Sequence, residues 1–159
     1  MPSVILLIGR LCSGKSTYAA GLAKEGVIVL SCDDVMQTLF PEPLGDRYDR
    51  YAARAFRYLY AQARRLHAQG YPVALDFGFW TRKSREEAQS ELRGIPLDWR
   101  MIDIDDEEWR RRIARRNAAM EQRLSERCDY LVDDGLLAKA MALYEPPTAD
   151  EGLSIRLVK

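Results

Sequence analysis

The sequence predicts an α/β fold in which a parallel sheet carries helices on both faces. Two observations support this prediction. Short apolar runs alternate with helical stretches along the whole chain, and the first run is followed directly by a glycine-rich loop and a helix. In parallel sheets of this kind the connections are right-handed, and ligands bind outside the carboxyl ends of the strands. We therefore expect a functional site at that edge of the sheet.

The predicted strands are short runs rich in branched or aromatic residues. The first run is continuous and ends at Gly9, as expected for a strand buried on both faces. The last is the weakest, because its apolar residues only alternate. In chain order the strands are predicted at residues 3–8, 27–30, 73–75, 99–104 and 153–158.

Helical stretches separate these strands. The longest spans residues 48–69, where apolar side chains recur every three or four positions until Gly70 and Pro72 end the helix. The other helices are predicted at residues 15–24, 81–93, 106–124 and 133–144.

Length and composition limit the classes of protein that fit. The 159 residues predict one domain over residues 1–159, and 24 basic against 24 acidic side chains argue against a general polyanion binder. The longest apolar run, Val4–Ile8, is too short for a membrane span or a signal peptide, so we expect a soluble cytoplasmic protein. Cys12, Cys32 and Cys128 lack metal-ligand spacing, which favours reduced thiols over a disulfide framework or a zinc site.

Residues 9–17 satisfy the pattern G-x-x-x-x-G-K-[ST] at every fixed position, between a strand and a helix. The two glycines allow a tight curl whose N–H groups cradle phosphate oxygens, helped by the helix N-terminus. Lys15 is expected to reach the β- and γ-phosphates, and the Ser16 hydroxyl to bind Mg²⁺. The ATP-binding residues predicted in this loop are Gly9, Cys12, Ser13, Gly14, Lys15, Ser16 and Thr17.

Carboxylates at the ends of later strands indicate which chemistry follows. Asp33 and Asp34 come after the second strand, where a carboxylate can accept the proton of an attacking hydroxyl. Either one is also a plausible helix N-cap. Asp76 ends the third strand, where we expect it to face Mg²⁺ directly or through water; a buried turn residue is the alternative.

Several motifs together resemble those of a known group of proteins. They are residues 9–17, Ser31-Cys32-Asp33-Asp34, Leu75-Asp76 with Thr81, Arg82 and Arg85, Arg112-Ile113-x-x-Arg116-Asn117, and Tyr144-Glu145-Pro146-Pro147. Over nearly the whole chain the sequence is similar to small phosphate-loop kinases, AAA-type ATP-binding proteins of the polynucleotide kinase, zeta toxin and chloramphenicol phosphotransferase group. The resemblance implies a three-layer P-loop NTPase fold with a five-stranded parallel sheet, and transfer of the γ-phosphoryl group of ATP to a hydroxyl with Asp33 as general base.

The resemblance also implies a lid over about residues 112–130. Arg112 and Arg116, four residues apart on one helix face, are predicted to clamp the phosphates; the alternative is a solvated face paired with nearby acids. Arg123 and Arg127 are weaker candidates in the same lid. Pro147 is expected beside the adenine, although Pro-Pro after a helix is equally a stop signal.

The acceptor pocket is harder to predict. Asp33, Asp34, Arg54, Phe79 and Arg82 are the candidates. Arg54 belongs to a stripe with Arg47, Arg50 and Arg57 that is equally an exposed face, and Phe79, with Phe77 and Trp80, is equally core packing. His67 is expected at the surface or as a helix cap, and the thiols of Cys12 and Cys32 as apolar filling or as sites of inactivating oxidation.

Together these features predict an ATP- and Mg²⁺-dependent kinase that phosphorylates a hydroxyl of a small molecule. Met36 stands where polynucleotide kinases carry an arginine, which disfavours a nucleic-acid 5′ end. The alternatives are a nucleotide or polynucleotide 5′-hydroxyl kinase, which requires the arginine stripe to face the pocket, and a non-catalytic ATP-binding switch module.

Overall fold

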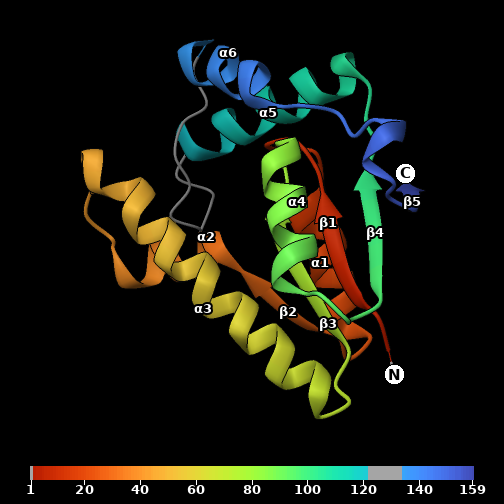
Figure 1. Ribbon diagram of the computed structural model, residues 1–159. Helices are drawn as coiled ribbons and strands as arrows, with labels where there is room; N and C mark the ends of the chain where they lie inside the picture. The colour runs from red at the N-terminus through yellow and green to blue at the C-terminus, as the bar shows by residue number, and fades with distance from the viewer. Residues whose placement is uncertain (1, 122–133) are drawn as a thin grey trace.

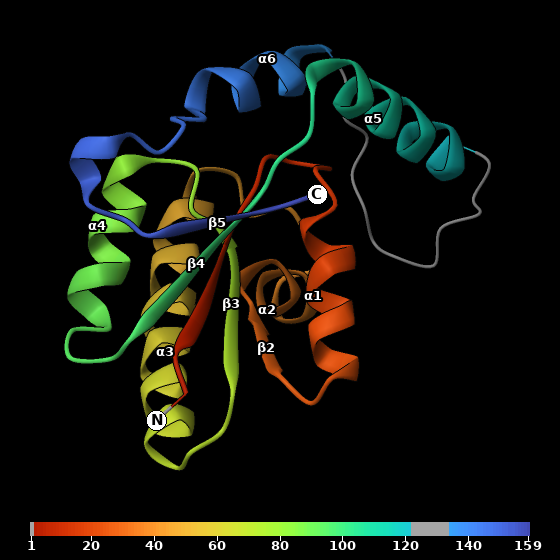
Figure 2. The same ribbon diagram turned by 90° about the vertical axis from the view of Figure 1, so that its right-hand side faces the viewer.

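The computed structural model describes residues 2–121 and 134–159. Its five strands form one parallel sheet in the order β2-β3-β1-β4-β5, with helices on both faces (Figures 1 and 2). The predicted five-stranded parallel sheet is confirmed. The strands are β1 (Val4–Ile8), β2 (Ile28–Ser31), β3 (Val73–Gly78), β4 (Leu97–Ile102) and β5 (Ile155–Val158).

Six helices are described around this sheet. They are α1 (Lys15–Lys24), α2 (Cys32–Leu39), α3 (Tyr48–Ala68), α4 (Arg82–Glu91), α5 (Asp106–Glu121) and α6 (Asp134–Leu143), with short 3-10 turns at Gly45–Arg47 and Ala149–Glu151. Most bounds lie within two residues of the sequence predictions, but β3 extends three residues beyond the predicted 73–75 and β5 begins two residues after the predicted 153. Two further differences stand out. β4 runs from residue 97 to 102, two residues earlier than predicted, and α2 had not been predicted as a helix.

The side chains of β1 point alternately to the two faces of the sheet, and each face is covered by its own layer of helices. Val4, Leu6 and Ile8 pack against α3 and α4 on one face of the sheet. Ile5 and Leu7 pack against α1 on the other face. All five side chains of β1 are almost completely buried, as expected for the central strand of a sheet covered on both sides.

The helices α5 and α6 lie across the edge of the sheet where the strands end (Figures 1 and 2). Trp109 and Ile113 of α5 pack there against Leu11 and Cys12 of the glycine-rich loop. The fold thus brings residues about a hundred positions apart in the sequence to the place where parallel sheets bind ligands.

His67 differs from the prediction of a surface or capping residue. Its side chain is buried, and its Nε2 donates to the carbonyl oxygen of Pro2 at 2.7 Å. The contact ties the last turn of α3 to Pro2, two residues before β1, at the amino end of the strands and far from the predicted site. Among the described helices, none is both long and apolar enough to cross a membrane.

Candidate active site

An open cleft of about 1670 Å³ runs along the carboxyl edge of the sheet. Pockets for one small ligand are usually roughly 300–1,000 Å³, so this cleft has room for two. We call the part lined by residues 10–23, Asp76 and residues 102–116 the loop half. The part lined by residues 29–56 with Phe77 and Glu87 is the α3 half.

The glycine-rich loop connects β1 to α1 and depends on both of its glycines. Gly14 has φ 97°, and a Cβ atom there would lie 2.4 Å from a guanidinium nitrogen of Arg112. A Cβ atom on Gly9 would lie 2.6 Å from Ser13 Oγ. Since Gly14 has no side chain with which to cap α1, the first amides of that helix are left for a ligand.

Three alternate carbonyl groups of this loop accept hydrogen bonds from side chains outside it. Trp80 Nε1 donates to the Gly9 oxygen at 2.7 Å, Trp109 Nε1 donates to the Leu11 oxygen, and Arg112 donates to the Ser13 oxygen at 2.7 Å. These contacts hold the carbonyl oxygens away from the place where an anion would bind. The hydrogen bonds from Trp80, which follows β3, and from two residues of α5 therefore hold the loop in a shape that suits a phosphate chain.

Lys15 and Asp76 form an ion pair at the floor of the cleft, with about a tenth of each side chain exposed. The Ser16 hydroxyl lies on the same part of the lining. A hydroxyl and a carboxylate are the hard oxygen ligands that Mg²⁺ prefers, and Mg²⁺ usually keeps several waters besides one or two protein ligands. The buried Ser13 Oγ has no hydrogen-bond partner among the described residues, consistent with a cradle shaped for a ligand. The residues present thus fit Mg²⁺ beside a phosphate chain.

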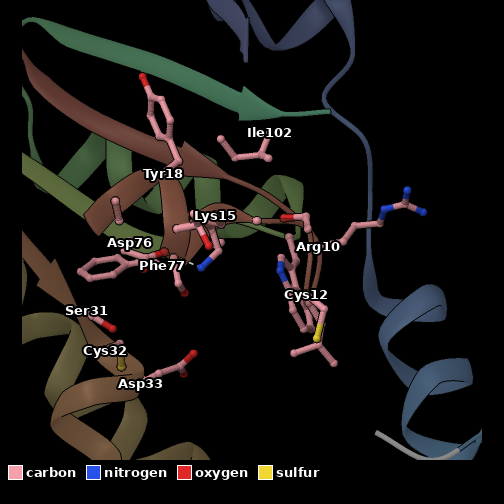
Figure 3. A pocket seen from close by; sticks show the side chains of 18 of the residues that line it. Arg10, Cys12, Lys15, Tyr18, Ser31, Cys32, Asp33, Asp76, Phe77 and Ile102 are labelled. Carbon is pink, nitrogen blue, oxygen red and sulfur yellow. Dashed lines mark hydrogen bonds and ion pairs between the residues drawn. The ribbon is translucent and has the colours of Figure 1, made fainter. Parts of the chain in front are cut away.

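Asp33 and Asp34 lie in the first turn of α2, and neither caps the helix. Ser31 is the N-cap: its Oγ accepts from the amide of Asp34 at 3.3 Å. The N-cap interpretation of the two aspartates was therefore wrong, and both carboxylates remain available to the cleft. Figure 3 shows Asp33 extending from the start of α2 toward the open centre of the cleft, below Lys15.

The electrostatic surroundings of Asp33 suit a proton acceptor. Its side chain is open to the cleft but has protein atoms on several sides, and this loss of solvent raises the pKa of its carboxyl group above the ordinary value. Lys15 opposes the rise, while Asp76 and Asp34 add to it. Next to it, burial and the charge of Asp33 raise the pKa of the Cys32 thiol to about 12, which keeps that thiol protonated at neutral pH.

The arginines of α5 reach the loop with different partners. Arg112 also donates to Glu108 at 3.0 Å, and Arg116 donates to the sulfur of Cys12 at 2.9 Å. Both line the cleft, as does Arg115, whereas Arg110 does not. Arg123, Arg127 and residues 122–130 of the predicted lid lie outside the described residues, as does Cys128.

Five predicted binding residues lie outside the lining of the cleft. Gly9 is one of them, although it shapes the phosphate loop. The prediction is corrected for the other four. Arg54 is exposed, with its guanidinium 5.4 Å from the ring centre of Tyr51. The Phe79 side chain is 2% exposed and packs edge-to-face on Trp99, because positive φ angles at Gly78 and Phe79 turn the chain into the core.

The other two are held near the start of α4. Arg82 pairs with Glu86 at 3.0 Å and Asp150 at 2.7 Å. Pro147 follows a segment in which the Glu145 amide donates to the Trp80 carbonyl oxygen at 2.7 Å, which holds that segment outside the cleft lining.

Comparison with known proteins agrees with this geometry. A family model described as an AAA domain matches residues 4–146. The chain belongs to this AAA domain family. No curated protein sequence matches it.

Solved structures share the fold of this AAA domain at low sequence identity. Kti12 from Chaetomium thermophilum in complex with ADP-AlF3 has a TM-score of 0.72 at 18% identity, covering 98% of this chain and 88% of Kti12. A gluconokinase from Sinorhizobium meliloti 1021 has a TM-score of 0.61 at 19% identity, covering 99% of this chain and 82% of the gluconokinase.

A third similar structure, from a Pnkp1/Rnl/Hen1 complex, has a TM-score of 0.62 at 21% identity. The match covers 70% of this chain but only 38% of the other chain, so the likeness is confined to one part of that longer protein. The three likenesses show that this AAA domain has the P-loop NTPase fold of these proteins.

Sequence reasoning missed several residues that line the cleft of the AAA domain or, like Trp109, support its phosphate loop from behind. The role of Trp109 could not be predicted, because a single tryptophan among acidic and basic residues is typical of an ordinary core residue. Asp49 and Glu87 line the α3 half from α3 and α4, and only knowledge of which helix face meets the cleft identifies them. Phe77, considered only as one of a group of aromatics, also lines the cleft.

Proposed function

We propose that this protein is an ATP- and Mg²⁺-dependent kinase that transfers the γ-phosphoryl group to a hydroxyl of a small molecule. The observation that carries the proposal is the opposition of Lys15, at the start of α1, and Asp33, at the start of α2, across one cleft that has room for two ligands. A phosphate-binding cation and a carboxylate with a raised pKa are what phosphoryl transfer to an alcohol needs.

On the nucleotide side, the amides of the loop and the start of α1 bind the phosphate chain of ATP. Lys15 leaves Asp76 for the β- and γ-phosphates, and this exchange frees the Asp76 carboxylate. Ser16 and Asp76 would hold Mg²⁺, which neutralises charge on the phosphates when it is bound. Arg112 and Arg116, now held by the loop and by Glu108, turn toward the transferring group.

On the acceptor side, Asp33 accepts the proton of the attacking hydroxyl as the new oxygen–phosphorus bond forms and ADP leaves. Its raised pKa makes it a better base than an ordinary aspartate. A polynucleotide 5′ end has less support, because none of Arg47, Arg50, Arg54 and Arg57 lines the cleft.

The test is a comparison of two single variants. We expect Asp33→Asn to bind ATP like the parent protein but to lose about 10²–10⁴-fold in turnover, or roughly 3–5.5 kcal/mol of barrier. Lys15→Ala should weaken both ATP binding and turnover. Binding is followed by calorimetry and turnover by acceptor-dependent ADP release.

Asp46→Asn is the matched control, since it removes an exposed carboxylate outside the cleft lining and leaves the base in place. Near-normal turnover of Asp33→Asn would remove Asp33 from the role of base. ATP binding with slow, acceptor-independent ADP release across all acceptors would favour the switch module instead.

A further inference from the structure

The charges on the two sides of the cleft differ, and we propose from this difference that the hydroxyl acceptor is an organic cation. Its chemical class is a hydroxyl-bearing amine, such as an amino alcohol, an amino sugar or an aminocyclitol. The inference rests on the proposed function, because it assigns the second ligand of the same cleft.

Carboxylates from three helices meet on the α3 half. Asp33 and Asp34 come from α2, Asp49 from α3 and Glu87 from α4. Among the described residues that line this half, none is a lysine, arginine or histidine. None of the four carboxylates forms an ion pair with a described residue.

The orientation of α3 explains why its arginines do not neutralise this charge. The residues that α3 turns to the cleft, Asp49, Ala52, Ala53 and Phe56, follow the spacing of one helix face. Arg47, Arg50, Arg54 and Arg57 fall on the other faces and are exposed. The guanidinium groups of Arg50 and Arg54 each lie 5.4 Å from the ring centre of Tyr51, outside the cleft lining.

Aromatic side chains stand beside these carboxylates. Phe56 and Phe77 line the cleft in edge-to-face contact, with ring centres 4.9 Å apart, and both remain partly exposed. Tyr48, also on the lining, is 46% exposed. Aromatic faces combined with carboxylates are the surroundings that bind an ammonium group, through cation–π contact and ion pairing.

An anionic acceptor would meet repulsion from four carboxylates, and the two described cations whose charges act on Asp33, Lys15 and Arg116, belong to the loop half. An amine removes this conflict, because its charge pairs with Asp49 and Glu87 while its hydroxyl faces Asp33. The negatively charged phosphates of ATP then lie in the loop half and the cation lies in the α3 half. Each half of the cleft receives the ligand charge that complements it.

The first test measures acceptor-dependent ADP release with saturating ATP and Mg²⁺ on three matched sets of compounds. The amines are ethanolamine, glucosamine and 2-deoxystreptamine. The neutral partners are ethylene glycol, glucose and myo-inositol, and the anionic partners are glycolate, gluconate and quinate. We expect turnover with an amine that exceeds turnover with its neutral partner, and the least with the anion.

The second test removes the charge from the pocket with Glu87→Gln and Asp49→Asn. Each variant should raise KM for the best amine by roughly 2- to 10-fold and leave KM for its neutral partner unchanged. Glu91→Gln, one turn along α4, and Asp46→Asn, just before α3, are the matched controls, because these acids are exposed and do not line the cleft. All four side chains are exposed, so we expect each variant to fold like the parent protein, and a thermal melt checks this.

Equal or better turnover with neutral or anionic compounds overturns the inference while leaving the kinase intact. So does ATP binding with no ADP release from any amine, or an equal effect of the pocket and control variants. Failure to bind ATP is a different result, since it removes the proposed function itself.

Discussion

Among the described residues, nine charged side chains line the loop half of the cleft and four line the α3 half, and the two halves hold their charges differently. In the loop half three ion pairs hold charges within the protein: Lys15 with Asp76, Arg10 with Asp106 at 2.8 Å, and Arg112 with Glu108 at 3.0 Å. In the α3 half, four carboxylates line the cleft with no ion-pair partner among the described residues.

This difference indicates two ways of preparing a site. The loop half is held by hydrogen bonds and ion pairs before a ligand arrives, and in the proposed function its ion pairs exchange partners when phosphates bind. The α3 half carries an excess of like charge that a ligand cation would relieve. Substitutions in the loop half should therefore disturb shape, whereas substitutions in the α3 half should disturb selectivity.

Among substitutions that disturb the shape of the loop half, the largest effect is expected at Gly14, which has no side chain. Gly14→Ala places a methyl group 2.4 Å from Arg112 at a residue with φ 97°, a conformation that costs an L-residue about 1–2 kcal/mol. Displacing the loop by about 1 Å is enough to cost about 10²-fold in turnover. We expect a loss of this size in turnover and a weaker affinity for ATP, measured by ADP release and calorimetry.

Gly21→Ala is the matched control for Gly14→Ala. Gly21 lies in the middle of α1, and a Cβ atom there would meet nothing within 4 Å. Alanine at this helical position should raise the free energy of unfolding by up to about 1 kcal/mol and leave ATP affinity unchanged. Equal loss of affinity in both variants would contradict the role given to the loop backbone.

A smaller effect is expected from the tryptophans that brace the loop. Trp109→Phe keeps an aromatic ring under Arg10, whose guanidinium lies 4.1 Å from the ring centre, but removes the donor to the Leu11 carbonyl. An unsatisfied buried carbonyl costs about 1–3 kcal/mol. We expect the free energy of unfolding to fall by this amount and KM for ATP to rise while KM for the acceptor stays the same.

Trp99→Phe is the matched control, because it reduces the volume of a buried ring without removing a hydrogen bond to the loop. Trp99 is also buried, in the core against Phe79, but it contacts no carbonyl of the loop in the described structure. Its substitution should lower stability without changing KM for ATP. If the two variants shift KM equally, the hydrogen bond to Leu11 does not position the loop.

The same contrast explains what the sequence could predict. The phosphate loop and Asp76 were predictable because their chemistry is encoded locally, in a strand, a turn and a helix that follow one another. The central strand was predictable because burial on both faces produces an uninterrupted apolar run. These features make up most of the sheet and of the loop half.

The α3 half depends instead on how distant elements meet. Phe79 turns into the core because of backbone angles at Gly78 and Phe79 that no apolar pattern reveals. Glu87 faces the cleft only because α4 packs on one particular face of the sheet. Arg54 was misplaced because periodicity predicts that α3 has two faces without saying which one borders the cleft.

The smallest predicted effect concerns the stability cost of the proposed base. In the folded protein the pKa of Asp33 lies above its unfolded value, because the cleft keeps solvent from its carboxylate. A raised pKa favours the protonated form, so the stabilisation is present below the unfolded pKa of an aspartate and is lost as the pH rises through the folded pKa. Above its folded pKa the ionised group therefore destabilises the fold slightly. Asp33→Asn should melt at a slightly higher temperature than the parent protein at pH 7.

This advantage should shrink as the pH falls toward the unfolded pKa of aspartate, since the parent protein then gains a proton in its folded state. Thermal melts of both proteins from pH 7 down to pH 4 measure the trend. Asp34→Asn is the control, because it lies in the same turn of α2 without being the base. A variant less stable than the parent at pH 7 would mean that Asp33 is held by favourable contacts, and the α3 half would then be balanced like the loop half rather than prepared for a cation.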